Sequence, residues 1–240
     1  MSIRKKNLMQ CLLRWIGGVV VGCFLLSILS VVVYKYVPVT YTPLMLIRTI
    51  EAHQAGKTFV IKHHWTPIEQ ISPHMVRAVM ASEDNLFLKH SGFSIDQIRL
   101  AIEEKQRGKR VRGGSTISQQ TAKNVFLIPS KTYLRKAVEA YFTVLIELIW
   151  SKERIMEVYL NVIEMGDGIF GIAAASEAYF HIAPQHLSSS QAALIAVCLP
   201  NPRKMSPSAP SQYVRKRQQQ ILKLMPKLGK IDLTAPRKKN

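Results

Sequence analysis

An uncharged, strongly apolar stretch near the N-terminus constrains this chain more than any other feature. The run Trp15–Tyr34 (WIGGVVVGCFLLSILSVVVY) contains no charged residue. As a helix rising about 1.5 Å per residue, it is long enough to span a hydrocarbon core about 30 Å thick. A cleaved signal peptide would have a shorter apolar core followed by small residues at its cleavage site. We therefore expect a transmembrane anchor over residues 15–36, preceded by a basic tail over residues 1–14.

The charges that flank this run predict its orientation. Basic residues precede it at Arg4, Lys5, Lys6 and Arg14, whereas Lys35 alone follows closely. Because basic residues stay on the cytoplasmic side, the N-terminus is expected in the cytoplasm and the rest of the chain across the membrane.

The excess of positive charge bears on the partners. The chain has 33 Lys and Arg against 15 Asp and Glu, a formal net charge of +18. Such a charge attracts anions at long range. Outside the cytoplasm the abundant anions are lipid headgroups and envelope polymers, so we expect membrane lipids as a partner and no nucleic acid.

The remainder of the chain has the pattern of an all-α domain. We expect this domain over residues 51–228, between a juxtamembrane segment (37–50) that lies along the membrane and a basic tail (229–240). Apolar spacing over Lys131–Glu164 predicts one core helix or two helices with a bend near Ser151, and Lys57–Trp65 alternates like a short hairpin. Helix-start signals stand at Ser72 before Pro73, Ser94 with Gln97, Thr116 with Gln119, Ser130, Ser188 with Gln191, and Ser211.

A pair of carboxylates lies in the segment Ser82–Phe93 (SEDNLFLKHSGF). The preceding helix brings Glu83 and Asp84 to its negative end, where a carboxyl group should hold its proton more tightly than in water. Such a group suits general acid or base catalysis near neutral pH. The alternative is a solvated acidic pair that ends a surface helix. Phe87 and His90 favour a site, because they are expected to wall the pair against apolar surface.

A glycine-rich stretch follows at Arg110–Asn124 (RVRGGSTISQQTAKN). Gly108–Ser115 nearly matches a P-loop, but Gly114 replaces its lysine and no strand leads into it, so nucleotide binding is not expected. The paired glycines let a ligand approach the backbone, and the helix that starts near Thr116 is expected to present free N–H groups to an anion, with Lys123 adding a charge. A flexible loop with a helix cap is the alternative.

A third cluster combines cations with a carboxylate. Lys131, Arg135 and Glu139 recur every four residues, which predicts one helix face. Surface ion pairs are one interpretation. With Lys123, the face would instead offer three cations to a diphosphate, and a carboxylate able to order a metal ion or a sugar hydroxyl.

Taken in order, the motifs EDNLFLKHSGF, GGSTISQQTAKN, RKAVE and KERIMEVYLNVIEMGDGIFGIAAASEAYF have the spacing found in a known family. The chain resembles the peptidoglycan glycosyltransferases of family 51, a domain also found at the front of bifunctional penicillin-binding proteins. The resemblance covers nearly everything after the anchor. It implies a lysozyme-like, two-lobed helical fold with a cleft between the lobes, located on the periplasmic side of the bacterial inner membrane.

The resemblance also implies a reaction: lipid II is polymerised into linear β-1,4 glycan with inversion, and undecaprenyl pyrophosphate is released. Glu83 matches the family's general base, and Glu139 matches its second glutamate, near the donor phosphates, either directly or through a divalent cation such as Mg²⁺ or Mn²⁺. Lys123, Lys131 and Arg135 would neutralise the leaving pyrophosphate, although the family often has arginine where Lys131 stands. The remaining matches, expected to shape the cleft, are Asp84, His90, Thr116, Gln120 and Asn124.

Several alternatives stay open. The transpeptidase of bifunctional relatives needs Ser-x-x-Lys and Lys-Thr-Gly, but here Ser2–Lys5 is the only match to the first and the second does not occur, so we expect no cross-linking activity. A glycan-degrading enzyme of lysozyme-like fold and a non-catalytic envelope scaffold are the rival functions. Division or elongation proteins and bifunctional penicillin-binding proteins are candidate partners beside lipid II and the nascent glycan. The apolar run Val125–Ile128 either enters the bilayer or belongs to the core.

Overall fold

The computed structural model describes residues 2–56, 58, 60–94, 99 and 114–235. The chain divides into two compact units, Met1–Val37 and Pro38–Asn240. Ser94 is described, but Gln97, with which it was expected to start a helix, and the glycine-rich segment up to Gly113 lie outside the described residues.

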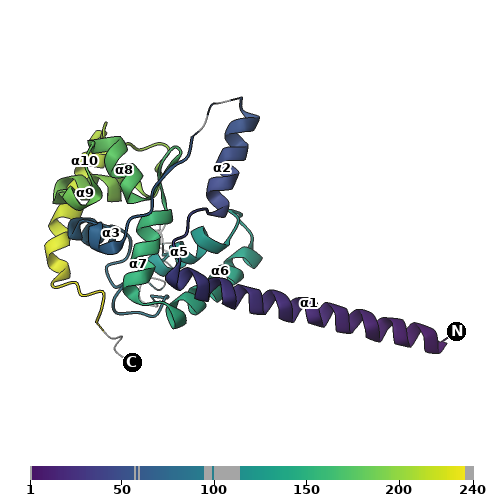
Figure 1. Ribbon diagram of the computed structural model, residues 1–240. Coiled ribbons are helices and arrows are strands. Elements are labelled where there is room, and N and C mark those ends of the chain that lie inside the picture. The colour runs from purple at the N-terminus through teal and green to yellow at the C-terminus, as the bar shows by residue number, and fades with distance from the viewer. Residues whose placement is uncertain (1, 57, 59, 95–98, 100–113, 236–240) are drawn as a thin grey trace. The chain divides into compact units, whose positions relative to one another are not determined.

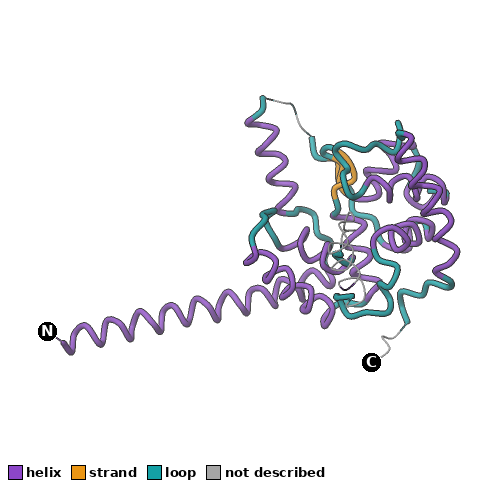
Figure 2. Tube along the Cα trace, turned by 180° about the vertical axis from the view of Figure 1, so that it is seen from behind, coloured by secondary structure: helices purple, strands orange, loops and turns teal. Residues whose placement is uncertain are grey.

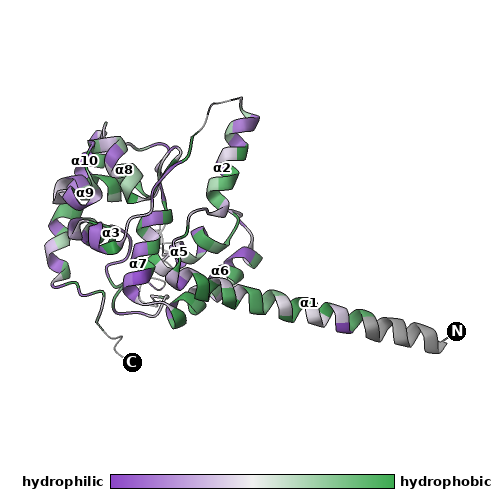
Figure 3. Cartoon of the chain, in the orientation of Figure 1, coloured by the Kyte–Doolittle hydropathy of each residue, from purple (hydrophilic) through white to green (hydrophobic). Residues whose placement is uncertain are grey.

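The first unit consists of helix α1, which runs from Ser2 to Tyr36 (Figure 1). Its portion Leu12–Tyr36 is long and apolar enough to cross a membrane, and Figure 3 colours most of this portion as hydrophobic. Large apolar side chains such as Trp15 and Leu26 are exposed along it. This confirms the predicted N-terminal helix that fits a membrane anchor.

The second unit is mainly helical, as predicted, and carries a small sheet (Figures 1 and 2). Helix α2 crosses residue 50, the predicted end of the juxtamembrane segment. The elements are α2 (Pro43–Gln54), β1 (Lys62–His63), η1 (Ile68–Gln70), α3 (Pro73–Glu83), α5 (Ile117–Phe126), α6 (Tyr133–Ile149), α7 (Lys152–Val162), β2 (Glu164–Gly166), β3 (Ile169–Phe170), α8 (Gly171–Phe180), η2 (Pro184–His186), α9 (Ser189–Cys198), α10 (Gln212–Leu224) and η3 (Met225–Leu228).

The small sheet corrects the prediction of a hairpin within Lys57–Trp65. Among the described residues of that segment, only Lys62–His63 forms a strand, and it pairs in parallel with β3, far along the chain. The hairpin is instead formed by β2 and β3, which pair antiparallel. Its turn contains Asp167-Gly168, a dipeptide typical of hairpins. Alternating residues alone therefore identified a strand but not its partner.

Most predicted helix starts are confirmed, because serine and threonine side chains accept hydrogen bonds from the first turn. The confirmed caps are Ser72, Thr116, Ser188 and Ser211. Ser130 was the wrong choice: α6 is capped by Thr132, which accepts from the backbone N–H of Arg135 at 3.2 Å. The long apolar pattern forms two helices, with Ser151 capping the second.

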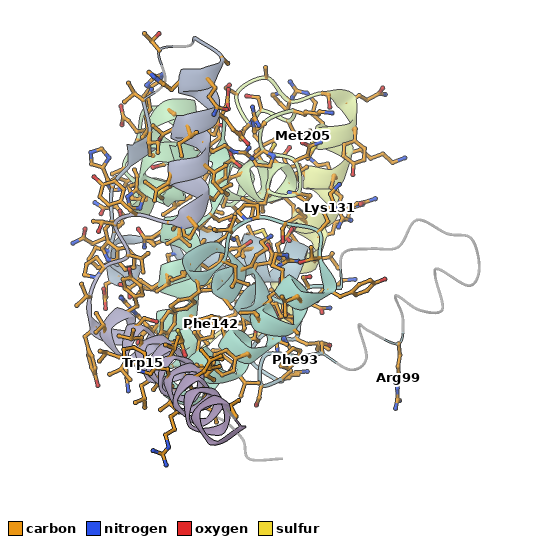
Figure 4. All side chains as sticks on the ribbon, turned by 90° about the vertical axis from the view of Figure 1, so that its right-hand side faces the viewer. Trp15, Phe93, Arg99, Lys131, Phe142 and Met205 are labelled. Carbon is orange, nitrogen blue, oxygen red and sulfur yellow. The ribbon has the colours of Figure 1, made fainter. Side chains whose placement is uncertain are left out.

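The helices pack as two groups that meet at the end of α3. Helix α3 packs against α9 and α10, whereas α5 packs against α6 and α7. Within the second group, Phe126 of α5 stacks on Phe142 of α6 with ring centroids 4.4 Å apart. Figure 4 labels Phe142 among the side chains of these helices. A long-range tie comes from buried Asn161 on α7, which accepts from the N–H of Thr66 at 2.7 Å and donates to its carbonyl at 2.8 Å. These two hydrogen bonds hold the chain at Thr66, in the segment that leads into α3.

Candidate active site

Glu83 is the last residue of α3, and its carboxylate is partly buried. Gln120 Nε2 donates to Oε2 at 3.1 Å, and Ser82 Oγ donates to Oε1 at 3.2 Å. Burial raises the pKa of Glu83, against the opposing effect of these two hydrogen bonds and of the charge on Arg217. The predicted direction of the pKa shift is therefore confirmed, although burial is its largest cause.

Asp84 connects α3 to α5. It is 1% exposed, and its carboxylate accepts from His90 Nε2 at 2.9 and 3.0 Å and from the N–H of Ile117 at 3.0 Å. The backbone N–H of Gly92 donates to His90 Nδ1 at 3.1 Å. Since Nδ1 accepts, Nε2 carries the proton that is donated to Asp84. The loop after α3 is thus fixed to the first turn of α5.

The start of α5 differs from the expectation that its N–H groups are free for a ligand. Ile117 N–H donates to Asp84, and Gln119 N–H donates to the side chain of Thr116 at 3.2 Å. Thr116 N–H donates in turn to Gln119 Oε1 at 3.0 Å, which completes a capping box. The anion at this positive helix end is therefore Asp84 itself. Thr116 is fully buried, and its hydroxyl donates to the carbonyl of Gly92 at 2.6 Å.

Two neighbours of Gln120 hold it in place. Asn124, buried on the same helix, donates from Nδ2 to the carbonyl of Gln120 at 2.8 Å. The hydroxyl of Tyr159 on α7 donates to Gln120 Oε1 at 3.5 Å. Burial, together with the charges of Glu83 and Asp84, raises the pKa of Tyr159 well above its ordinary value, so this hydroxyl stays protonated. Sequence reasoning missed Tyr159; its only signal was its position within the KERIMEVYLN motif.

Lys123 lies one turn beyond Gln120 on α5 and is partly buried. Burial lowers its pKa, Glu139 and Glu83 act in the opposite direction, and the nearby cations Arg135 and Lys136 lower it further. Within the part of the chain that the structure describes, no carboxylate pairs with it directly. The charges of Glu139 and Glu83 thus partly offset the effect of burial on the pKa of Lys123.

Glu139 is 2% exposed and sits between two cations of α6. Its Oε2 accepts from Arg135 Nη1 at 2.6 Å, and its Oε1 pairs with Lys136 Nζ. The prediction that Lys131 shares this helix face is wrong, because Lys131 precedes the cap of α6 and is exposed. The four-residue spacing did not predict the ion pair between Glu139 and Lys136, which lies three residues before it.

Two further expectations concern a metal ion and the bilayer. Among the described residues, no three His, Cys, Asp or Glu side chains lie together as metal ligands, and both oxygens of Glu139 are already paired with cations. Glu139 as it stands therefore does not fit a resident divalent ion. The two ends of the run Val125–Ile128 differ in exposure. Val125 is 5% exposed and packs in the core, whereas Ile128 is 67% exposed.

Comparison with known proteins identifies the class to which this fold and site belong. Residues 51–226 match the family model described as Transglycosylase, and the chain belongs to this family. The predicted family and the predicted class of enzyme are both confirmed.

Relatives similar to this chain carry the name biosynthetic peptidoglycan transglycosylase. One from Bacteroides thetaiotaomicron is 50% identical over 95% of this chain and 94% of its own length. One from Bdellovibrio bacteriovorus is 48% identical over 89% of this chain and 85% of its own. A third, from Shewanella oneidensis, is 45% identical over 91% and 93% respectively.

Proposed function

We propose that this protein polymerises lipid II into linear β-1,4 glycan strands and releases undecaprenyl pyrophosphate. The observation that carries the proposal is the placement of Glu83 beside the helix that bears Lys123: Gln120 of α5 donates to Glu83 at 3.1 Å, and Lys123 lies one turn further along α5. Glycosyl transfer from a diphospholipid needs a base at the acceptor and positive charge at the leaving group. The names of the relatives support the same reaction.

Glu83 acts as the general base in this mechanism. It takes the proton from the 4-hydroxyl of the acceptor sugar as that oxygen attacks the anomeric carbon of the donor chain. Its raised pKa brings its proton affinity nearer to neutral pH, where a general base is most effective. Attack from the face opposite the leaving group inverts the anomeric carbon and produces the β-linkage.

The cations stabilise the pyrophosphate as the bond to the sugar breaks. Lys123 and Arg135 provide charge on α5 and α6, and exposed Lys131 adds a third cation from the segment between them. Glu139 keeps Arg135 in position through their ion pair. Asp84, His90, Thr116 and Asn124 position the loop and helix that carry Glu83 and Gln120, through the hydrogen bonds given above.

A divalent cation is proposed only as a companion of the substrate. Since Arg135 and Lys136 occupy the oxygens of Glu139, Mg²⁺ or Mn²⁺ would arrive bound to the pyrophosphate, whose oxygens suit such ions. Polymerisation measured with and without a chelator tests this. If the ion comes with the substrate, the rate in chelator should fall less than after loss of Lys123.

The proposed membrane location rests on α1 and on the distribution of charges along it. The basic residues in the N-terminal part of α1 support a cytoplasmic N-terminus and a periplasmic catalytic domain at the inner membrane. Protease added to spheroplasts should then digest the second unit while the membrane remains intact. Digestion only after the membrane is permeabilised would reverse the orientation.

The decisive experiment uses the full chain in detergent, incubated with lipid II and, separately, with finished glycan. The parent should lengthen glycan from lipid II, and Glu83→Gln should slow polymerisation by about 10²–10⁴-fold, the usual contribution of a general base, while still binding lipid II. Glu177→Gln is the matched control, because Glu177 is 73% exposed on α8. Shortening of finished glycan would favour the degrading enzyme. No reaction with either substrate would favour the scaffold.

A further inference from the structure

A buried lysine lies behind the loop that follows Glu83. Lys152 is the first residue of α7 and is only 5% exposed. Its Nζ donates to Glu147 Oε1 and to the carbonyl of His90, each at 2.8 Å, and lies 4.4 Å from the centre of the Phe87 ring. One ammonium group therefore contacts α6 and two points of the loop between Asp84 and Gly92.

Stability alone does not account for this ammonium group. A cation at the first position of a helix faces the positive end of the helix dipole. A buried ion pair also loses hydration, and apolar side chains of similar volume often serve the fold equally well. Glu147 is 3% exposed and accepts a further hydrogen bond from Ser118 of α5. The pair thus joins α5, α6 and α7 at one point, although removing its two charges from water costs free energy.

The loop held by this pair is fixed at both of its ends. At the first end, the ring of His90 donates to Asp84, which in turn accepts from Ile117 of α5. At the other end, Gly92 accepts from Thr116 and lies against Glu147: a Cβ built on Gly92 would be 3.0 Å from Cγ of Glu147. Glu147 and Lys152 therefore contact this loop at three residues, Phe87, His90 and Gly92.

We propose that Glu147 and Lys152 form a positioning pair: through the carbonyl of His90 and the ring of Phe87, they hold the loop that sets Glu83 beside Gln120. The inference rests on the proposed function of Glu83. Neither residue touches the reacting groups. Their effect is on the orientation of the base, and a displacement of about 1 Å costs on the order of 100-fold in rate.

The test replaces both members together, so that no buried charge is left unpaired. The double variant Glu147→Gln, Lys152→Met keeps similar volumes, and its melting temperature should stay within about 4 °C of the parent. Its kcat for lipid II polymerisation should fall about 100-fold, with KM nearly unchanged. The matched control is Glu157→Gln, Arg154→Met, which removes an ion pair of the same helix whose members contact Ile68 and Trp65.

A second readout separates positioning from loss of stability. Burial raises the pKa of Glu83, so a loosened loop that admits water lowers it. A base works when deprotonated, and the acidic limb of kcat/KM should therefore move to lower pH in the double variant. Hydrogen exchange at the N–H of Ile117 and Gly92 should become faster as well, and this measurement does not depend on activity.

The outcomes divide as follows. A folded double variant with parental kcat and an unmoved acidic limb overturns the inference, and so does an equal loss of kcat in the control pair. If the double variant does not fold, Phe87→Leu decides, because it removes the ring contact of the ammonium group and leaves no buried charge unpaired: reduced kcat with a shifted limb supports positioning, and parental values overturn it. A parent that does not polymerise lipid II refutes the proposed function instead, while hydrogen exchange still reports on the loop.

Discussion

Gln120 on α5 donates from its side-chain amide to the carboxylate of Glu83 on α3 at 3.1 Å. This contact joins the two helix groups at the candidate base. It also opposes the effect of burial, because a donor favours the charged carboxylate while burial favours the protonated form. The proton affinity of Glu83 is therefore set by a balance in which burial is the larger influence.

Removal of the Gln120 side chain should raise the pKa of Glu83 further. In Gln120→Ala the pKa of Glu83 rises, so the acidic limb of kcat/KM moves to higher pH. At neutral pH kcat/KM should fall about tenfold, in line with the ~1.5 kcal/mol of a hydrogen bond to a charged group. A pH profile of polymerisation measures both effects, with exposed Gln219→Ala as the control. A limb that moves to lower pH would show that Gln120 acts mainly by excluding water.

Local signals in the sequence predicted a large part of this arrangement. The capping box of Thr116 and Gln119 depends on residues three apart, and the break at Ser151 depends on a single cap. The start of α3, capped by Ser72, follows from the same local rules. Such features are predictable because every interacting group lies within about one turn of helix.

Contacts between distant segments were not predictable in this way. Nothing near Asp84 in the sequence indicates that Ile117 donates to it, and the pairing of Tyr159 with Gln120 joins two helices. The error at Lys131 has another origin. The cap of α6 lies two residues later than expected, and this displacement removes Lys131 from the helix. Helix boundaries are the least reliable part of any sequence-based prediction.

Lys123 should act on the chemical step more than on substrate affinity. Negative charge on the pyrophosphate grows as the glycosidic bond breaks, so a nearby cation stabilises the transition state more than the bound substrate. Lys123→Ala should lower kcat about 100-fold, with KM raised by less than about threefold. Steady-state kinetics with lipid II measure both values, and Lys204→Ala, at an exposed position, is the control. An increase in KM alone would assign Lys123 to binding.

Gly92 should tolerate no side chain, because its surroundings are closed. Its φ is +88°, and an added Cβ would lie 2.8 Å from Cγ2 of Thr143. Gly56 is the matched control, with φ of +64° and nothing within 4 Å of an added Cβ. Both substitutions to alanine incur the left-handed backbone cost of about 1–2 kcal/mol, and Gly92→Ala adds about 1–3 kcal/mol of overpacking. Thermal unfolding in detergent should rank the two, and equal melting temperatures would contradict the crowding.

The raised pKa of Glu83 predicts that the base destabilises the fold that holds it. Below the pKa of the unfolded state, Glu83 is protonated in both states and costs nothing. As pH rises through the unfolded and then the folded pKa, the charged carboxylate increasingly favours the unfolded chain. Neutral Glu83→Gln removes this penalty, so the melting temperature of the variant should exceed that of the parent at pH 7, and the difference should vanish near pH 4, about the ordinary pKa of glutamate. Glu177→Gln, on the surface, should give no such pH-dependent gain. A lower melting temperature for Glu83→Gln at pH 7 would mean that the hydrogen bonds from Gln120 and Ser82 outweigh burial, and the pKa of Glu83 would then lie below its ordinary value.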